Sequence, residues 1–261
     1  MSRLSAEEKA AYERDGFLLR RGKFTADEVA ELIEASEELC RDLVQAEGRT
    51  KMRVSADYVF EPDATKGVII KWEPGAEDVV QGVEPCVHLH PIYEKYRSHA
   101  EFVDPARDIL GLDDVDLFTE KLNLKRARAG GKYALHQDFP YWSRADEADR
   151  MVTALVALDE ATVENGALQV HPGSHTKGVV PGKKSELKFE ELEIDPATYP
   201  TDEMISVEMK PGDVVFFGPM LVHTSPANPS DKDRRALLYT YQRAGNVTAL
   251  ENLRKTLARQ S

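Results

Sequence analysis

Short apolar runs separated by turn residues fill the second half of the chain, and they restrict its fold more than any other feature. Residues 118–125 alternate between apolar and polar side chains, as a strand with one buried face does. Four further apolar or aromatic runs follow, with turn signals such as Asn-Gly and Pro-Gly between them, at residues 151–158, 167–170, 214–217 and 235–241. Short strands punctuated by turns in this way are typical of a β-sandwich or barrel.

The first 110 residues predict helices that flank this β-rich core, with short strands among them. Ser5 and Thr25 are each followed three positions later by Glu, which is the capping box that begins a helix. Apolar residues recur at helical spacing after Thr25. Short strands are expected at residues 16–20 and 67–72, and a further helix is expected over residues 91–99.

No internal repeat, low-complexity tract or linker divides the 261 residues, so we predict a single domain. Its fold class is mainly β with flanking helices. We expect a mainly helical flank with short strands over residues 1–110, a β core over residues 111–245 and a C-terminal helix over residues 246–261.

Charge and cysteine content narrow the classes of function. The formal net charge is −12, which argues against nucleic acid as a partner and against binding to the negative surface of a membrane. No apolar run approaches the roughly 20 residues that a membrane-spanning helix needs, and the first residues lack the apolar segment of a signal peptide. Cys40 and Cys86 cannot form a disulfide framework, so we expect a reduced, cytoplasmic protein.

The sequence His136-Gln-Asp138, together with His223, suggests a metal site. In an extended segment, residues two apart point to the same side, so His136 and Asp138 can bind one ion together. His223 follows the apolar run at residues 214–217. Two imidazoles and one carboxylate on one face of an ion form the facial triad of non-haem Fe(II) oxygenases, which leaves open positions for an oxidant and a cosubstrate.

The other histidines fit this chemistry less well. His88 and His90 have the same two-residue spacing but no nearby carboxylate, and Pro91 is expected to begin a helix beside them. His171 and His175 flank a Pro-Gly-Ser turn, where capping of backbone groups is the commoner role of a histidine.

An arginine after the third histidine suggests what else the metal site binds. Arg234 lies eleven positions after His223, at the start of the last expected strand. A 2-oxoacid that chelates iron leaves its far carboxylate in need of a cation, and a guanidinium matches a carboxylate at two points. Ser225 can add a hydroxyl donor. Arg235 is an alternative to Arg234, since strand alternation lets only one of the two face the interior.

Side chains near the triad are the candidates for substrate contact. Tyr141 and Trp142 follow the His-x-Asp sequence closely enough to form a wall of the pocket, and the further candidates are Gln137, Thr119 and Lys121. Ordinary core packing is the alternative for the aromatic residues, and exposure to water is the alternative for Lys121. Lys71 and Trp72 are assigned here to a lid.

At this point the sequence resembles the phytanoyl-CoA dioxygenase family, which includes the ectoine hydroxylases. The opening motif is Tyr12-Glu-Arg-Asp-Gly-Phe-Leu, and the later motifs stand in the family's order as Leu135-His-Gln-Asp-Phe, Glu164-Asn-Gly-Ala-Leu, Pro172-Gly-Ser-His and His223-Thr-Ser-Pro-Ala-Asn-Pro-Ser followed by Arg234. Leu122-Asn-Leu-Lys125 resembles the corresponding strand of the ectoine hydroxylases. Thr119 stands where those enzymes place a substrate-binding glutamine, so the resemblance does not identify ectoine as the substrate.

The resemblance implies a double-stranded β-helix, the jelly-roll or cupin-like fold. It implies that His136, Asp138 and His223 hold Fe(II), and that Arg234 and Lys125 help to bind 2-oxoglutarate. It also implies a dioxygenase that uses O2 to hydroxylate a C–H bond of a small molecule, with release of succinate and CO2. Related halogenases replace the carboxylate ligand by a small residue, so retention of Asp138 favours hydroxylation or another oxidation, such as desaturation.

Two other classes of protein are compatible with parts of this pattern. One is a non-catalytic jelly-roll protein that binds a metal and 2-oxoglutarate, although such a protein would be free to lose the ligands. The other is a zinc hydrolase on a cupin-like barrel, which would leave Arg234 without a role. We expect a monomer or a weak homodimer.

Overall fold

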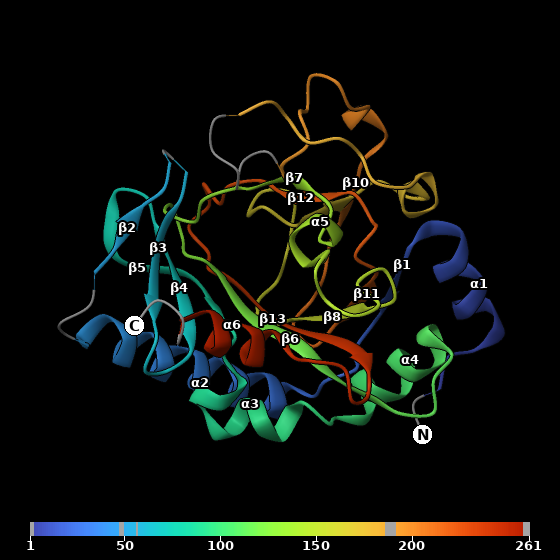
Figure 1. Cartoon of the computed structure of the whole chain (residues 1–261), viewed down its shortest axis with the longest axis horizontal. Helices are drawn as coiled ribbons and strands as arrows, with labels where there is room; N and C mark the ends of the chain where they lie inside the picture. Colours follow the sequence, from blue (N-terminus) through green and yellow to red (C-terminus); the bar gives the residue numbers. More distant parts are fainter. Residues whose placement is uncertain (1–2, 47–49, 56, 186–191, 258–261) are drawn as a thin grey trace.

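Nine antiparallel strands form the larger of two sheets within the part of the chain that the structure describes (Figure 1). The structure is a computed structural model, and it describes residues 3–46, 50–55, 57–185 and 192–257. Along the larger sheet the strands lie in the order β1 (Phe17–Arg20), β11 (Val214–Phe217), β8 (Val152–Ala157), β13 (Arg234–Arg243), β6 (Val115–Lys125), β5 (Ala76–Glu84), β4 (Val68–Glu73), β3 (Val59–Asp63) and β2 (Met52–Arg53).

The smaller sheet lies across one face of the larger sheet, at the top of Figure 1. Its described strands are all antiparallel, in the order β10 (Ile205–Val207), β9 (Leu168–Val170), β12 (His223–Ser225) and β7 (Tyr133–His136). Leu155 and Phe217 of the larger sheet and Val170 of the smaller sheet belong to one buried cluster between the two sheets. The architecture is the jelly roll that the family resemblance implies, and each of the strands expected from residue 118 onward is present.

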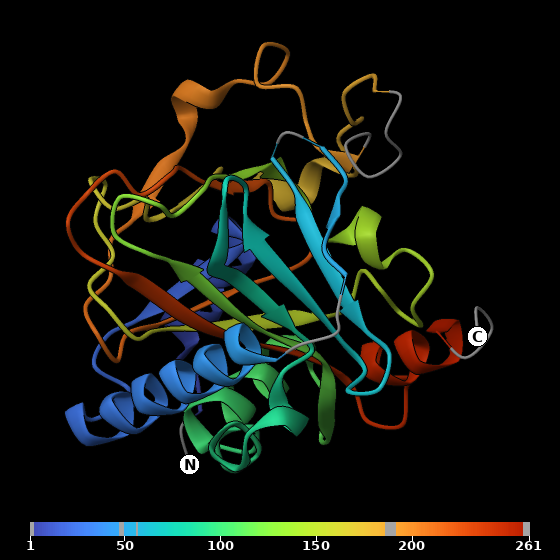
Figure 2. The ribbon, with the colours of Figure 1, turned by 90° about the vertical axis from the view of Figure 1, so that its left-hand side faces the viewer.

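Helices within residues 26–110 cover the opposite face of the larger sheet (Figure 2). The first two helices begin at the capping boxes that the sequence predicts: Ser5 Oγ accepts from the Glu8 amide and Thr25 Oγ1 from the Glu28 amide. None of the helices in the described ranges has the length and apolar character required to span a membrane. The helices are α1 (Ala6–Asp15), α2 (Ala26–Gln45), α3 (Pro91–Tyr96), α4 (Ala100–Leu110), α5 (Phe139–Trp142) and α6 (Ala249–Leu257), with 3-10 turns at Val87–Leu89, Ser174–Lys177 and Thr201–Glu203.

The meander from β2 to β5 is the main departure from the sequence-based expectation. Only the strand at residues 67–72 is predicted there, whereas β2, β3 and β5 also join the larger sheet. In β3 the positions that face inward are Val59, Glu61 and Asp63, so two buried carboxylates interrupt the apolar alternation that identifies a strand. Pro62 adds a second contrary signal, since proline donates no hydrogen bond to a sheet.

The packing of α2 on the larger sheet gives a direct test of the fold. Leu32 lies on the buried face of this helix and is fully buried, whereas Val44 is exposed on the same helix. Leu32→Ala should lower the free energy of unfolding by about 2–5 kcal/mol, because it leaves a cavity in the core. Val44→Ala should change it by no more than about 0.5 kcal/mol. Urea unfolding measures both, and equal losses would contradict the packing described here.

Candidate metal centre

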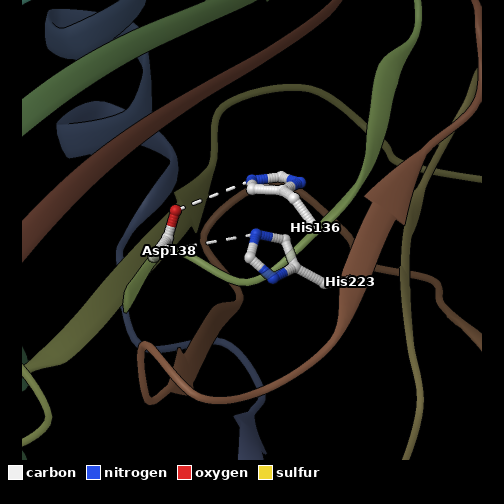
Figure 3. A group of neighbouring side chains, drawn as sticks. All are labelled: His136, Asp138 and His223. Atoms are coloured by element: carbon white, nitrogen blue, oxygen red, sulfur yellow. Dashed lines mark ion pairs between the residues drawn. The ribbon is translucent and has the colours of Figure 1, made fainter. Parts of the chain in front are cut away.

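Two neighbouring strands of the smaller sheet bring the predicted metal ligands together. β12 pairs with β7 so that His223 lies directly opposite His136. Asp138 follows β7, and its carboxylate lies 3.6 Å from His136 Nε2 and 4.0 Å from His223 Nε2. The ligand atoms of the three residues all lie within 4.8 Å of one another (Figure 3). One ion can therefore contact all three side chains.

Backbone carbonyls fix the orientation of both imidazoles. His136 Nδ1 lies 2.7 Å from the carbonyl oxygen of Ala134, and His223 Nδ1 lies 2.9 Å from that of Leu221. A carbonyl oxygen only accepts hydrogen bonds, so each Nδ1 carries a proton and Nε2 is the ring nitrogen that is free to face a metal. Both Nε2 atoms face Asp138. This is the outer-shell support that metal-binding histidines usually have.

The electrostatics of the triad also suit a divalent cation. Burial, followed by the neighbouring His136, lowers the pKa of His223 to about 4, so this ring is neutral at neutral pH. Burial acts to raise the pKa of Asp138, but the two histidines outweigh it and lower that pKa to about 2. Two neutral imidazoles and one carboxylate are the donor set of the Fe(II) facial triad.

Two cavities meet at the triad. The outer cavity has a volume of about 610 Å³ and lies between the β3–β5 meander, α5 and α6. The inner cavity is smaller and lies between the two sheets, where Leu155, Leu168 and Phe217 form its apolar walls. His136 and Asp138 line both cavities, whereas His223 lines only the inner cavity. A metal at the triad would therefore face both.

Arg234 extends into the inner cavity from β13, and it has no carboxylate partner among the described residues. Its Nη2 donates to the carbonyl oxygen of Gly166 at 2.8 Å and to Ser225 Oγ at 2.6 Å, while its buried Nε has no acceptor. Burial lowers the pKa of Arg234 to about 10. A buried guanidinium without a counter-ion is costly. Its position beside the triad therefore suits an anionic ligand.

Arg235 has a different environment, as strand alternation requires. Its guanidinium makes two hydrogen bonds to the carboxylate of Asp159, at 2.7 and 2.8 Å, and a third to Glu37. It lines neither cavity. Of the two adjacent arginines that the sequence leaves as alternatives, only Arg234 is placed to meet a ligand.

Ser225 and Lys125 lie close to Arg234 but differ in access. Ser225 Oγ accepts from Arg234 and donates to the Gly166 carbonyl at 2.8 Å, and the side chain lines the inner cavity. Lys125 is fully buried and lines neither cavity; its Nζ donates to the carbonyl oxygens of Ser225 and Pro226. Burial, followed by Arg234, lowers the pKa of Lys125 to about 6. In this structure Lys125 supports the segment that carries Ser225.

Four of the five candidate substrate contacts face a cavity. Tyr141 lines the outer cavity, Trp142 and Lys121 line both cavities, and Thr119 lines the inner cavity. Lys121 makes an ion pair of 2.9 Å with Glu84, which also accepts a hydrogen bond from Thr119.

Gln137 is the exception, and its assignment to substrate contact is wrong for this structure. Its side chain points opposite to those of His136 and Asp138, as alternation in an extended segment dictates. Its amide donates to the carbonyl oxygens of Gly178 and Met220 and accepts from the Val180 amide. Gln137 is buried and holds these loops together.

The assignment of Lys71 and Trp72 to a lid also needs correction. Both lie within β4, a strand of the larger sheet with a partner on each side. Trp72 is buried in the core beneath the sheet, whereas Lys71 on the other face lines the outer cavity. Several other residues that line this cavity belong to no motif by which the sequence could have identified them. They include Tyr58, Phe60 and Ile69.

The remaining histidines have structural roles where the structure shows their contacts. His90 Nδ1 accepts from the Ile92 amide and caps α3, and His175 Nε2 contacts the carbonyl oxygen of Glu13. His171 is buried and lies 3.2 Å from Glu203. His88 contacts the carbonyl oxygen of Lys66.

Comparisons with known proteins agree with this geometry. Residues 12–236 match the family described as "Phytanoyl-CoA dioxygenase (PhyH)". The chain belongs to the phytanoyl-CoA dioxygenase family. It is similar to the ectoine dioxygenase of Sphingopyxis alaskensis, with 29% identity over 93% of this chain and 77% of the relative. It is also similar to the methylphosphonate hydroxylase of Gimesia maris, with 31% identity over 71% of this chain and 69% of that protein.

Solved structures of family members show the same fold. The crystal structure of EctD from S. alaskensis with 2-oxoglutarate and 5-hydroxyectoine is 28% identical, with a TM-score of 0.71 over 93% of this chain and 77% of that chain. A second structure of the same protein, with bound Fe, superposes with a TM-score of 0.70 over 92% of this chain and 77% of that chain, at 27% identity. The donor set of His136, Asp138 and His223 fits the iron found in that relative.

Metal binding can be tested without any assumption about the reaction. His136→Ala removes one of three ligands, so the affinity for Co(II), used as a spectroscopic probe, should fall by at least about 100-fold, since loss of mere supporting groups already costs 10–100-fold. His171→Ala removes a buried histidine outside the triad and should leave the affinity unchanged. Anaerobic titration followed by visible absorption measures both. Equal affinities of the two variants would contradict the assigned ligands.

Proposed function

We propose that this protein is an Fe(II)- and 2-oxoglutarate-dependent dioxygenase that hydroxylates a C–H bond of a small-molecule metabolite. The observation that carries the proposal is the buried Arg234, which has no carboxylate partner among the described residues and lines a cavity bounded by the metal triad. A 2-oxoacid with a second carboxylate satisfies both sites at once. Ectoine dioxygenase and L-proline trans-4-hydroxylase are relatives whose names describe such oxidations.

Different residues of the inner cavity bind the two ends of the cosubstrate. His136, Asp138 and His223 hold Fe(II), and Arg234 with Ser225 binds the far carboxylate of 2-oxoglutarate. The apolar walls of the inner cavity exclude water, which strengthens these charged contacts. When bound, Fe(II) and 2-oxoglutarate together supply the chemistry that uses O2 to oxidise a C–H bond, with release of succinate and CO2.

The outer cavity is the proposed site of the substrate. His136 and Asp138 form its inner end, so a molecule bound there presents a C–H bond to the metal from the side opposite Arg234. Trp142 and Lys121 lie at the junction of the two cavities. These two residues therefore position substrate relative to cosubstrate, and Tyr141 packs its ring edge-on at 5.7 Å from the ring of His136.

The two rival functions account for less of the structure. A non-catalytic binding protein has no need of the outer cavity beside an intact triad, and a zinc hydrolase has no use for a buried arginine in a second cavity. Retention of Asp138 as a ligand supports hydroxylation over halogenation.

We further propose that the protein works in the cytoplasm as a monomer or weak homodimer. Its two cysteines, Cys40 and Cys86, are buried free thiols, which suits a reducing compartment. Large exposed apolar side chains are few within the described ranges, namely Val44, Met52, Val163, Val179 and Ile205.

The proposal predicts a spectroscopic signal and a product. The purified protein with Fe(II) and 2-oxoglutarate should show the weak visible absorption band of the chelate under anaerobic conditions, and it should form succinate when air is admitted. Zn(II) in place of Fe(II) should give neither. If neither the band nor succinate appears with Fe(II), the protein is not an oxygenase. If the band appears but no tested substrate leads to succinate, a binding protein is favoured.

The adjacent arginines provide a matched pair of variants. Arg234→Met should weaken 2-oxoglutarate binding by roughly 10–100-fold, the equivalent of a lost charge-assisted contact, and should not lower the melting temperature, because the lost charge was unpaired. Arg235→Met should lower the melting temperature, because it leaves Asp159 partly buried without its partner. It should bind 2-oxoglutarate nearly as well as the unaltered protein. The reverse pattern would show that Arg235, not Arg234, binds the cosubstrate.

A further inference from the structure

The outer cavity is basic although the protein is acidic. The chain carries a formal net charge of −12. In contrast, four cationic side chains line the outer cavity and only two carboxylates do, and these six residues are Lys71, Lys121, Arg144, Lys255, Glu84 and Asp138. Asp138 belongs to the metal triad, where a divalent cation more than neutralises it. The cavity therefore has a positive charge that the surface as a whole does not.

Lys71 is the cation whose environment is most unusual. Lys121 is neutralised by Glu84 at 2.9 Å, and Arg144 and Lys255 are exposed to water at the rim. Lys71 is partly buried on β4, and within the described ranges no carboxylate lies within ion-pair distance of it. Its Nζ lies over two tyrosine rings of the cavity wall, 4.4 Å from the centre of Tyr58 and 4.5 Å from that of Tyr133.

The surroundings of Lys71 disfavour its charged form. Burial, followed by the repulsion of Lys121, lowers the pKa of Lys71 to about 7, although Glu73, Glu193 and Asp57 act at longer range to raise it. The two tyrosine faces supply only part of the solvation that the ammonium loses. An anion in the cavity would restore that stabilisation and keep the lysine protonated.

The remainder of the outer cavity is largely apolar. Phe60, Ile69, Phe118 and Leu253 are among its walls. Leu253 and Lys255 belong to α6, which follows the family match that ends at residue 236. This wall therefore lies outside the part of the chain that identifies the family.

We propose that the substrate is a small organic anion, a carboxylate on an apolar body, and that Lys71 binds its carboxylate. The apolar body lies along Phe60, Ile69 and Phe118, and the end remote from the carboxylate reaches the metal. Lys71 is thus a specificity-determining residue, separate from Arg234, which lines only the inner cavity. The inference rests on the proposed function, because it names the class of molecule that the dioxygenase would oxidise.

The test compares acids with their neutral amides. Octanoate and octanamide, and likewise 3-phenylpropanoate and 3-phenylpropanamide, have the same shape but differ in charge. Calorimetric titration of the anaerobic protein with Fe(II) and 2-oxoglutarate should show that each acid binds about 10–100-fold more tightly than its amide. Equal binding of acid and amide, or binding of neither pair, would overturn the proposal.

Variants of Lys71 assign the preference to this residue. Lys71→Met should abolish the preference for the acid and should nearly keep the melting temperature, because the charge that it removes has no carboxylate partner and the methionine still packs against the two tyrosine rings. Lys71→Arg should retain the preference. Lys232→Met, which removes an exposed lysine outside both cavities, is the control and should behave as the unaltered protein does. A preference that survives in Lys71→Met would assign it to another cation and overturn the role of Lys71.

Dependence on pH gives a second readout. Lysine is charged below its pKa, so the affinity for octanoate should level off just below about pH 7, where the probe is still a carboxylate, and should fall by up to about tenfold per pH unit above it. The affinity for octanamide should not change over the same range. Parallel profiles of acid and amide would contradict the charge on Lys71 as the cause.

Failure of this inference can be told apart from failure of the proposed function. The anaerobic absorption band and the slow formation of succinate without substrate depend on the triad and Arg234, not on Lys71. If both signals appear but acid and amide bind alike, the dioxygenase proposal stands and the substrate class is wrong. If both signals are missing but the metal-free protein still prefers the acid, the anion site stands without the reaction.

Discussion

The pairing of β7 with β12 is the constraint on which the rest of the molecule depends. It places His136 opposite His223 and sets both Nε2 atoms toward Asp138. Because side chains alternate along a strand, a shift of one residue in this register would turn one histidine away from the other. The remaining strands of the smaller sheet and the apolar cluster between the sheets keep that register in place. The chemistry of the site is therefore a consequence of sheet geometry.

The two sides of the triad differ in how their charges are compensated. On the inner side, Arg234 is held by a carbonyl and a hydroxyl, neutral groups that orient a guanidinium but do not neutralise it. On the outer side, Lys71 is held by two aromatic faces, which orient an ammonium in the same incomplete way. By contrast, the buried Arg20 forms ion pairs with Glu8 and Glu101. Arg234 and Lys71 therefore keep uncompensated charge where a ligand has room to bind.

The features that could be predicted from the sequence are those that depend on residues close together in the chain. Helix starts at Ser5 and Thr25, the alternating strand β6 and the His-x-Asp spacing follow from patterns within a few residues of each other. The spacing from His223 points to Arg234 or its neighbour Arg235. Which of the two meets a ligand depends on which face of β13 borders the inner cavity. That choice is made by neighbouring strands, β6 and β8, far away in sequence.

The features that the sequence could not reveal are those in which buried positions carry polar residues. The buried carboxylates Glu61 and Asp63 break the apolar alternation by which a strand is recognised. Gln137 lies between two of the proposed metal ligands, yet its side chain contacts loops and not a cavity. Nothing in the sequence distinguishes Lys71 from the other lysines, because its contacts with two tyrosine rings arise only in the folded chain.

The position of α6 has a further consequence for how such a protein can diversify. This helix forms one wall of the outer cavity, yet it comes after β13, and among the described residues no strand pairing involves a residue after Arg243. Changes in α6 can therefore reshape the space offered to a guest molecule while the register of every strand, and with it the metal triad, stays the same. The substrate can then change through substitutions in α6, while the strands that hold the triad preserve the reaction.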